Sequence, residues 1–129
     1  MTNYTNFTAP IARLLLALVF FISGINKIFS YTGTQAYMEA FSIPGGLLPF
    51  VIIIEVVAGL MVTIGWKTRC SALILAGFSL ISAMIFHTNF SDQMQFIMFM
   101  KNIGLTGGLL LLIANGPGAY ALDNRVKSE

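Results

Sequence analysis

The chain has 129 residues, 57% of them hydrophobic and only 9% charged, and its mean hydropathy is +0.83. Soluble domains contain roughly 45 to 50% apolar and 25% charged residues, so this composition excludes an ordinary soluble domain and predicts an integral membrane protein. The formal net charge is +2, and the basic residues form no stripe and no Gly-rich phosphate loop, so we expect no nucleic-acid partner.

Crossing the ~30 Å hydrocarbon core of a bilayer takes about 20 helical residues. Four apolar stretches are long enough, and they predict helices at about residues 10–29, 47–65, 70–87 and 94–114. Little chain remains between these spans. We therefore expect residues 1–129 to form a single all-α domain, an integral membrane four-helix bundle in contact with the lipid bilayer.

The first predicted span carries Ser23 and Lys27, which lie four residues apart and share a helix face with Gly24. Lys27 is near the end of the span, so snorkelling to the headgroups explains it when it is taken alone. The segment before the span has no basic n-region, and no small-residue cleavage site follows. We therefore expect this helix to be retained rather than removed as a signal peptide.

The loop after the first span contains the sequence QAYMEAF, in which Tyr37 and Phe41 are four residues apart. This spacing suits one or two helical turns lying in the membrane interface, with an aromatic-anchored loop as the equal alternative.

The second and fourth spans each carry a charged residue, which is rare and energetically costly within a membrane helix. Glu55 lies in the second span with Gly59 four residues later, and Lys101 lies in the fourth with Gly104 and Gly108 on the same stripe. An ionisable group at a helix centre costs roughly 2.5 to 3.5 kcal/mol on insertion scales, so it usually faces a partner, a cavity or a substrate. For the glycines, a packing or homo-oligomer face is the alternative interpretation.

Basic residues predict the orientation. Lysine and arginine gather at the start of the first span, in the loop after the second and in the tail, so the positive-inside rule places both termini in the cytoplasm and residues 30–46 and 88–93 outside. Glu55 and Lys101 then lie at similar depth, roughly 9 to 11 Å from the outer helix ends. Lys27 and His87 fall slightly above them.

Each of the four spans thus contributes one ionisable group to the outer half of the bundle, which favours a ligand site or proton relay. A structural Glu55–Lys101 pair that fixes helix register is the alternative, and His87 taken alone is more simply a solvated helix end. One histidine and one cysteine exclude bis-His haem ligation and a His/Cys metal cluster, so we expect no metal site.

The ordered motifs resemble those of the DoxX family of small bacterial membrane proteins over nearly the whole chain. They are an early arginine, SG-x-x-K ending at Lys27, IPGGLLP before the Glu55 helix, G-x-x-x-R ending at Arg69, His87, Lys101-Asn102, and GPG-x-x-x-LD ending at Asp123. The resemblance implies a multi-pass protein of the bacterial cell inner membrane. It also implies a link to membrane oxidoreductase complexes and to quinone or catechol stress.

The residues and the resemblance together give a hypothesis of function: a quinone-linked component of a membrane oxidoreductase system. A polar pocket would hold quinone without a covalently bound cofactor, with a membrane or periplasmic oxidoreductase as the partner. Lys27 and Lys101 would donate to the quinone oxygens, Glu55 would balance charge or relay a proton, and His87 would be a second proton group. Two alternatives remain: a small-solute permease or binding protein, and a non-catalytic assembly subunit. Whether the protein is an enzyme is left open.

Overall fold

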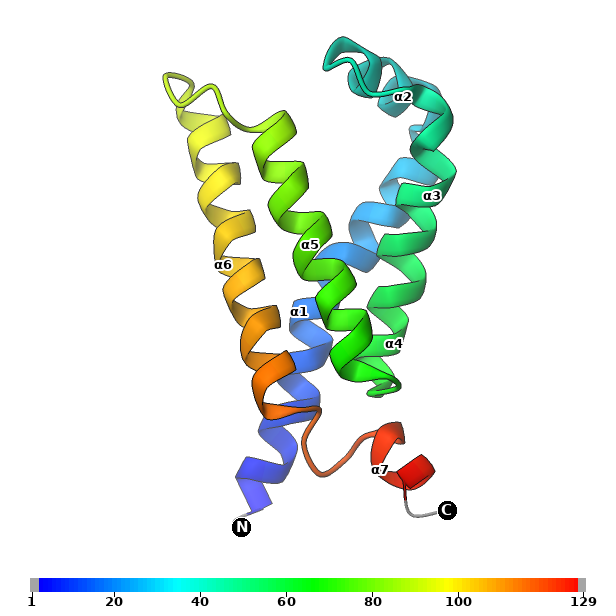
Figure 1. Ribbon diagram of the computed structural model, residues 1–129, viewed down its shortest axis with the longest axis vertical. Helices are drawn as coiled ribbons and strands as arrows, with labels where there is room; N and C mark the ends of the chain where they lie inside the picture. Colours follow the sequence, from blue (N-terminus) through cyan, green and yellow to red (C-terminus); the bar gives the residue numbers. More distant parts are fainter. Residues whose placement is uncertain (1–2, 128–129) are drawn as a thin grey trace.

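The computed structural model describes the backbone of residues 3–127 and the side chains of residues 6–125. Within this part all regular secondary structure is helical, as predicted (Figure 1). The helices are α1 (Asn3–Phe29), α2 (Tyr31–Ala40), η1 (Gly45–Leu47), α3 (Leu48–Ile53), η2 (Ile54–Ala58), α4 (Gly59–Ile64), α5 (Thr68–Phe86), α6 (Gln93–Asn115) and α7 (Leu122–Lys127).

Among the described residues, four helical spans are long and apolar enough to cross a membrane, which confirms the predicted number: Asn6–Phe29, Gly45–Ile64, Thr68–Phe86 and Gln93–Asn115. The second span is one long helix composed of η1, α3, η2 and α4. Many large apolar side chains on these helices are exposed, including Leu15, Leu111 and Met84 at 61 to 65%. In water such a surface would aggregate, so these side chains contact lipid acyl chains.

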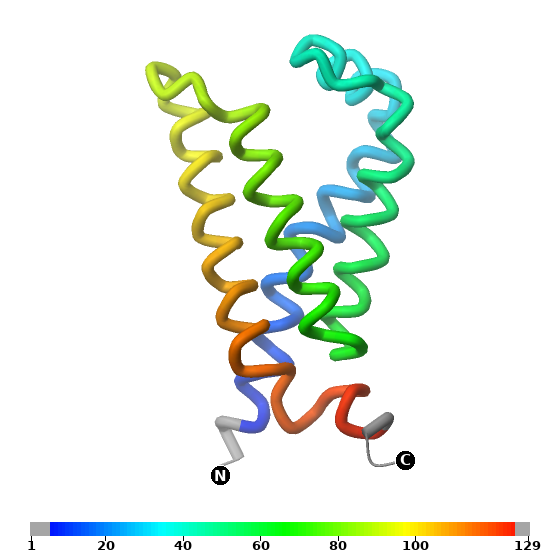
Figure 2. The backbone as a smooth tube through the Cα atoms, viewed as in Figure 1, coloured from blue at the N-terminus to red at the C-terminus, as the bar shows by residue number. Residues whose placement is uncertain are grey.

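The spans form two hairpins, as Figure 2 shows in the path of the chain. The first hairpin pairs α1 with α3, η2 and α4, and the second pairs α5 with α6. Both termini and the turn after α4 lie at one end of the bundle, which we call the terminal end, whereas α2 and the loop between α5 and α6 lie at the other, the α2 end. This agrees with the predicted grouping of the loops.

The hydrophobic core lies toward the terminal end, where the two hairpins meet. Its residues are small at several contacts, so that helix backbones approach closely; they are Ala17, Phe20, Ala58, Val62, Ala72, Leu75, Ala76 and Leu109. Toward the α2 end the hairpins diverge, which gives the V shape of Figure 1. The fold therefore places its best packing at one end and leaves space at the other.

One segment differs from the sequence prediction, and another adopts one of its two predicted alternatives. The first helix does not begin at Pro10 but at Asn3, because its first turns pack on the C-terminal segment: the rings of Phe7 and Tyr120 are 5.5 Å apart. This tertiary contact outweighs the helix-breaking tendency of proline. The segment that contains QAYMEAF is helical, as one of the two alternatives predicted: it forms α2, whose Gln35 amide donates to the carbonyl oxygen of Gly45 at 3.1 Å.

The orientation of the bundle in the membrane remains a prediction. In a Cys70→Ser background, Thr34→Cys should react with a membrane-impermeant thiol reagent added from the periplasmic side, because Thr34 lies in α2. Ser128→Cys, outside the described residues, should react only from the cytoplasmic side. Labelling of Thr34→Cys from the cytoplasm alone would invert the orientation.

Candidate functional site

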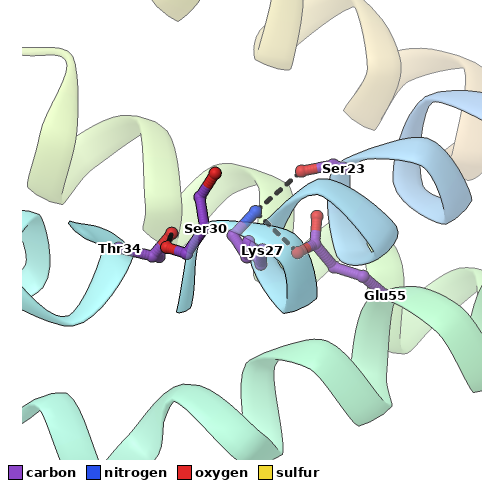
Figure 3. A network of polar contacts seen from close by, with 5 residues as sticks. All are labelled: Ser23, Lys27, Ser30, Thr34 and Glu55. Carbon is purple, nitrogen blue, oxygen red and sulfur yellow. Dashed lines mark hydrogen bonds and ion pairs between the residues drawn. The ribbon is translucent and has the colours of Figure 1, made fainter. Parts of the chain in front are cut away.

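The charge in the second span is neutralised by a lysine of the first. Lys27 Nζ lies 2.7 Å from Glu55 Oε1 and also donates to Ser23 Oγ at 2.7 Å (Figure 3). The Glu55 side chain is 3% exposed and that of Lys27 is 24% exposed. The alternative Glu55–Lys101 pair is therefore wrong: Lys27 comes from the adjacent helix of the same hairpin, whereas Lys101 is on α6, in the other one.

Close approach of two backbones makes this ion pair reachable. A Cβ atom on Gly24 would lie only 2.7 Å from Val56 Cγ2, so a larger residue at position 24 would push α1 away from η2. Gly59 continues the same contact, with its Cβ position 3.6 Å from the carbonyl oxygen of Ala17. Both glycines are close-packing residues between α1 and the second span. In contrast, a Cβ on Gly104 would meet nothing within 4 Å.

Glu55 lies in a π-helical turn, which the sequence did not predict. The turn comprises Ile54–Ala58 and interrupts an otherwise α-helical span. Such turns carry one extra residue, occur mostly as single bulges inside α-helices, and are frequent at functional sites. The carboxylate thus projects toward α1 from an irregular turn of the helix.

The ion pair forms one wall of a large cleft. The cleft has a volume of about 1140 Å³ and lies between the two hairpins. Every residue predicted to bind a ligand or relay a proton lines it, and so does Ser23: these are Ser23, Lys27, Glu55, His87, Lys101 and Asn102. Most of the remaining lining is apolar, from α1, α3 and α5. A cleft with a few converging polar groups in apolar walls is the usual form of a small-molecule site.

The wall opposite the ion pair carries the hydroxyl group of Ser79, the side-chain amide of Asn102 and the ammonium group of Lys101. Asn102 donates its side-chain amide to the carbonyl oxygen of Ser79 at 3.3 Å, which joins α6 to α5. Lys101 is exposed on the cleft, and among the described residues it has no ion-pair partner. Because Lys27 and Glu55 cancel, Lys101 leaves the lining with one uncompensated positive charge.

Two buried polar atoms around the cleft, Ser79 Oγ and His87 Nδ1, lack a hydrogen-bond partner in the described part of the chain. Glu55 Oε1 is not unsatisfied in this sense, because it forms the ion pair with Lys27 at 2.7 Å. Buried polar groups are almost always satisfied, so unsatisfied ones that line a cleft point to a missing partner.

His87 ends α5 at the α2 end of the cleft. Burial lowers the pKa of its imidazole, because desolvation disfavours the charged form. At neutral pH the ring is therefore uncharged and offers one nitrogen as donor and one as acceptor. His87 is thus a half-buried residue at a helix end that also lines the cleft.

An aromatic cluster covers the same end of the cleft. Tyr37 of α2, Phe41 directly after that helix and Phe86 of α5 lie with ring centroids 5.1 to 5.4 Å apart. Aromatic pairs in these arrangements contribute about 0.5 to 1.5 kcal/mol beyond their buried area. The cluster links the two hairpins where their backbones diverge. The spacing of Tyr37 and Phe41 in the sequence indicated that these two rings lie on one helical face, but it did not identify Phe86 as their partner.

A second polar centre, at the terminal end, escaped the sequence interpretation. Arg13, expected only to set orientation, is 2% exposed and donates to the carbonyl oxygens of Val62 (3.2 Å), Thr63 (2.9 Å) and Tyr120. Asp123 accepts hydrogen bonds from the backbone N–H groups of Lys67 and Thr68. The sequence feature that could have predicted this centre is the position of Arg13 inside an apolar run. This centre ties the C-terminal segment to the bundle and takes no part in the cleft.

Comparison with known proteins gives the family. Residues 9–88 match the family model described as DoxX. The chain is 48% identical over 119 residues to "Inner membrane protein YqjF" of Escherichia coli (strain K12), covering 92% of each chain. The chain belongs to the DoxX family. It is 34% identical over 122 residues to "Inner membrane protein YphA" of the same organism, covering 89% of this chain and 87% of that one.

No solved structure matches the chain. The names of both DoxX-family relatives place them in the inner membrane, and the four apolar spans agree with that location. The resemblance drawn from the motifs is thus confirmed, and the protein is a multi-pass inner-membrane protein. The relatives' names say nothing of a ligand, so function must be argued from the cleft.

Proposed function

We propose that this DoxX-family protein binds a quinone or a similar small aromatic in the cleft, as a quinone-linked component of a membrane oxidoreductase system. The observation that carries the proposal is the convergence of Lys27, Glu55, His87 and Lys101 on one apolar-walled cleft. Fixing helix register needs one satisfied pair, which Lys27 and Glu55 already supply. Lys101 and His87 are then available for a ligand.

The lining matches the chemistry of a quinone. A quinone ring is flat and apolar, and its two oxygens accept hydrogen bonds. Lys101 Nζ donates to one oxygen from α6, and Lys27 Nζ to the other from α1, where Ser23 and Glu55 hold its ammonium group in place. The apolar walls and the rings of Tyr37 and Phe86 contact the ring faces.

Reduction of a quinone to a quinol takes up two electrons and two protons. The electrons come from a partner oxidoreductase with its own cofactor, and this chain passes on two protons that it takes up from water. Glu55 relays a proton through Lys27, while His87 serves as a second proton group at the α2 end. A neutral imidazole is suited to this role because it both accepts and donates a proton near neutral pH.

A thermal-stability titration of the detergent-purified protein with a tail-less ubiquinone analogue tests the proposal. A ligand that binds only the folded state stabilises it by about 2.7 kcal/mol at a concentration of one hundred times Kd. The wild type should show a saturable rise in melting temperature, and Lys101→Met should lose most of it. Lys67→Met is the control, because Lys67 lies in the turn at the terminal end and outside the cleft.

The proposal fails if no ubiquinone or menaquinone analogue shifts the melting temperature of the wild type. It also fails if Lys101→Met and Lys67→Met respond as the wild type does, because the binding would then lie elsewhere.

A further inference from the structure

A second hollow lies between α1 and α6, in the half of the bundle nearer the terminal end. It is a groove of about 540 Å³ with Ala12 and Leu16 on one side and Leu105, Gly108 and Leu112 on the other. Arg13 and Asn115 lie at its far end. Apart from this end its walls are apolar, so it is unsuited to a charged or strongly polar molecule.

The groove is continuous with the polar cleft. Leu15 of α1 and Leu105 of α6 line both hollows. Asn102 and Lys101, in the wall of the cleft, lie about one helical turn before Leu105 on the same helix. A molecule bound in the cleft can therefore extend into the groove without leaving the protein surface.

Small residues keep the groove open. A Cβ on Gly108 would lie 3.5 Å from Leu16 Cδ1, an ordinary contact distance, and no larger side chain fills this position. Ala12 faces it from α1 and is exposed. Only 6% of the most apolar stretch of α6 is buried inside the protein. The contact between α6 and α1 therefore leaves the groove accessible.

We infer that the groove holds the hydrocarbon chain of an amphiphilic ligand whose oxygen-bearing head lies in the polar cleft. The inference rests on the proposed function and restricts it: the ligand is a chain-bearing, lipid-soluble quinone rather than a water-soluble one. The wall from Leu105 to Leu112 rises by seven residues, about 10 Å at 1.5 Å per residue, so it is long enough for an extended hydrocarbon chain.

This arrangement also fits the surroundings. The aromatic cluster of Tyr37, Phe41 and Phe86 covers the cleft at the α2 end, whereas exposed apolar residues such as Leu15 and Ile74 border it on the side. A ligand dissolved in the bilayer reaches the cleft from the side, with its chain already among acyl chains. In lipid the groove gains no hydrophobic transfer energy and selects the chain by packing alone.

The ligand's hydrocarbon chain has apolar surroundings both in the groove and in the lipid. Where the chain lies is therefore a sharper test than how tightly the ligand binds. The probe is a ubiquinone analogue whose decyl chain ends in a photoreactive diazirine, added to the protein in lipid nanodiscs. After illumination, mass spectrometry should find the label mainly on residues 9–16 and 105–112. Gly108→Leu should reduce this labelling roughly tenfold, because the leucine side chain would occupy the part of the groove that the ligand's hydrocarbon chain needs.

Gly107→Leu is the matched control. It introduces the same side chain one residue away, where a Cβ would meet nothing within 4 Å, and it should label as the wild type does. Ala12→Leu fills the groove from the opposite wall and replaces Gly108→Leu if the latter does not fold. Both groove variants should keep the melting-temperature shift with the tail-less analogue, which depends on the cleft alone.

Two results would overturn the inference while leaving the proposed function intact. In the first, the tail-less analogue binds but the label is spread over lipid-facing positions such as Leu110 and Leu80. In the second, a phospholipid with the same diazirine labels the groove as strongly as the quinone does, which identifies an ordinary lipid site. Absence of any shift with the tail-less analogue counts instead against the proposed function.

Discussion

Replacing Lys27 with methionine should destabilise the protein by about 3 to 5 kcal/mol, the usual cost of breaking a buried ion pair. The reason is Glu55, whose side chain is 3% exposed and would be left unpaired. Glu55→Leu should cost less, because Lys27 is 24% exposed and keeps its contact with Ser23. The double variant should recover much of the loss, since it leaves no unpaired charge. Unfolding of the purified protein by denaturing detergent measures all three.

A second cycle gives the control. Glu55→Leu combined with Lys101→Met should be additive, because Lys101 lies on α6 and does not pair with Glu55. Additive losses for Lys27 and Glu55, or coupling between Glu55 and Lys101, would contradict the pairing described here.

Arg13→Leu should destabilise the protein by about 4 to 9 kcal/mol and release the C-terminal segment. It deprives three carbonyl groups, those of Val62, Thr63 and Tyr120, of a charged donor, and hydrogen bonds to charged groups contribute about 1.5 to 3 kcal/mol each. Asp123, which interacts electrostatically with Arg13, would lose its counter-charge. Denaturation in detergent measures the loss, and faster proteolysis after α6 reports the release.

Arg13→Lys separates charge from geometry. A lysine keeps the charge but lacks the planar fork that reaches several acceptors at once, so we expect roughly half of the loss. Leu14→Met, on the exposed lipid-facing side of the same turn, should have little effect. A lysine variant as stable as the wild type would contradict the role assigned to the fork.

The sequence predicts the spans well because membrane thickness dictates their length. Each predicted span agrees with a candidate span to within four residues at either end. The helix α1 extends past its predicted start because of a tertiary contact between Phe7 and Tyr120. Contacts of this kind depend on the folded arrangement, which composition and periodicity do not specify. The short helix α7 was missed for the same reason.

The candidate site was predicted in part. Helical depth correctly brought Lys27, Glu55, His87 and Lys101 to one region, because rise per residue is fixed. Depth does not specify rotation about the helix axis, and rotation decides which charges meet. Lys27 pairs with Glu55 because the small residue Gly24 lets η2 approach α1, a contact that only the packed structure reveals.

The π-helical turn around Glu55 makes the second span sensitive to its residue count. Each residue rotates an α-helix by about 100°, so removing one residue from Ile54–Ala58 and restoring regular α-helix would turn the rest of the span by that angle. Glu55 and Gly59 could then no longer both face α1. Either the ion pair with Lys27 or the close packing at Gly59 would be lost. Along this turn, family members should tolerate substitutions far more readily than insertions or deletions, which offers a simple criterion for aligning distant relatives.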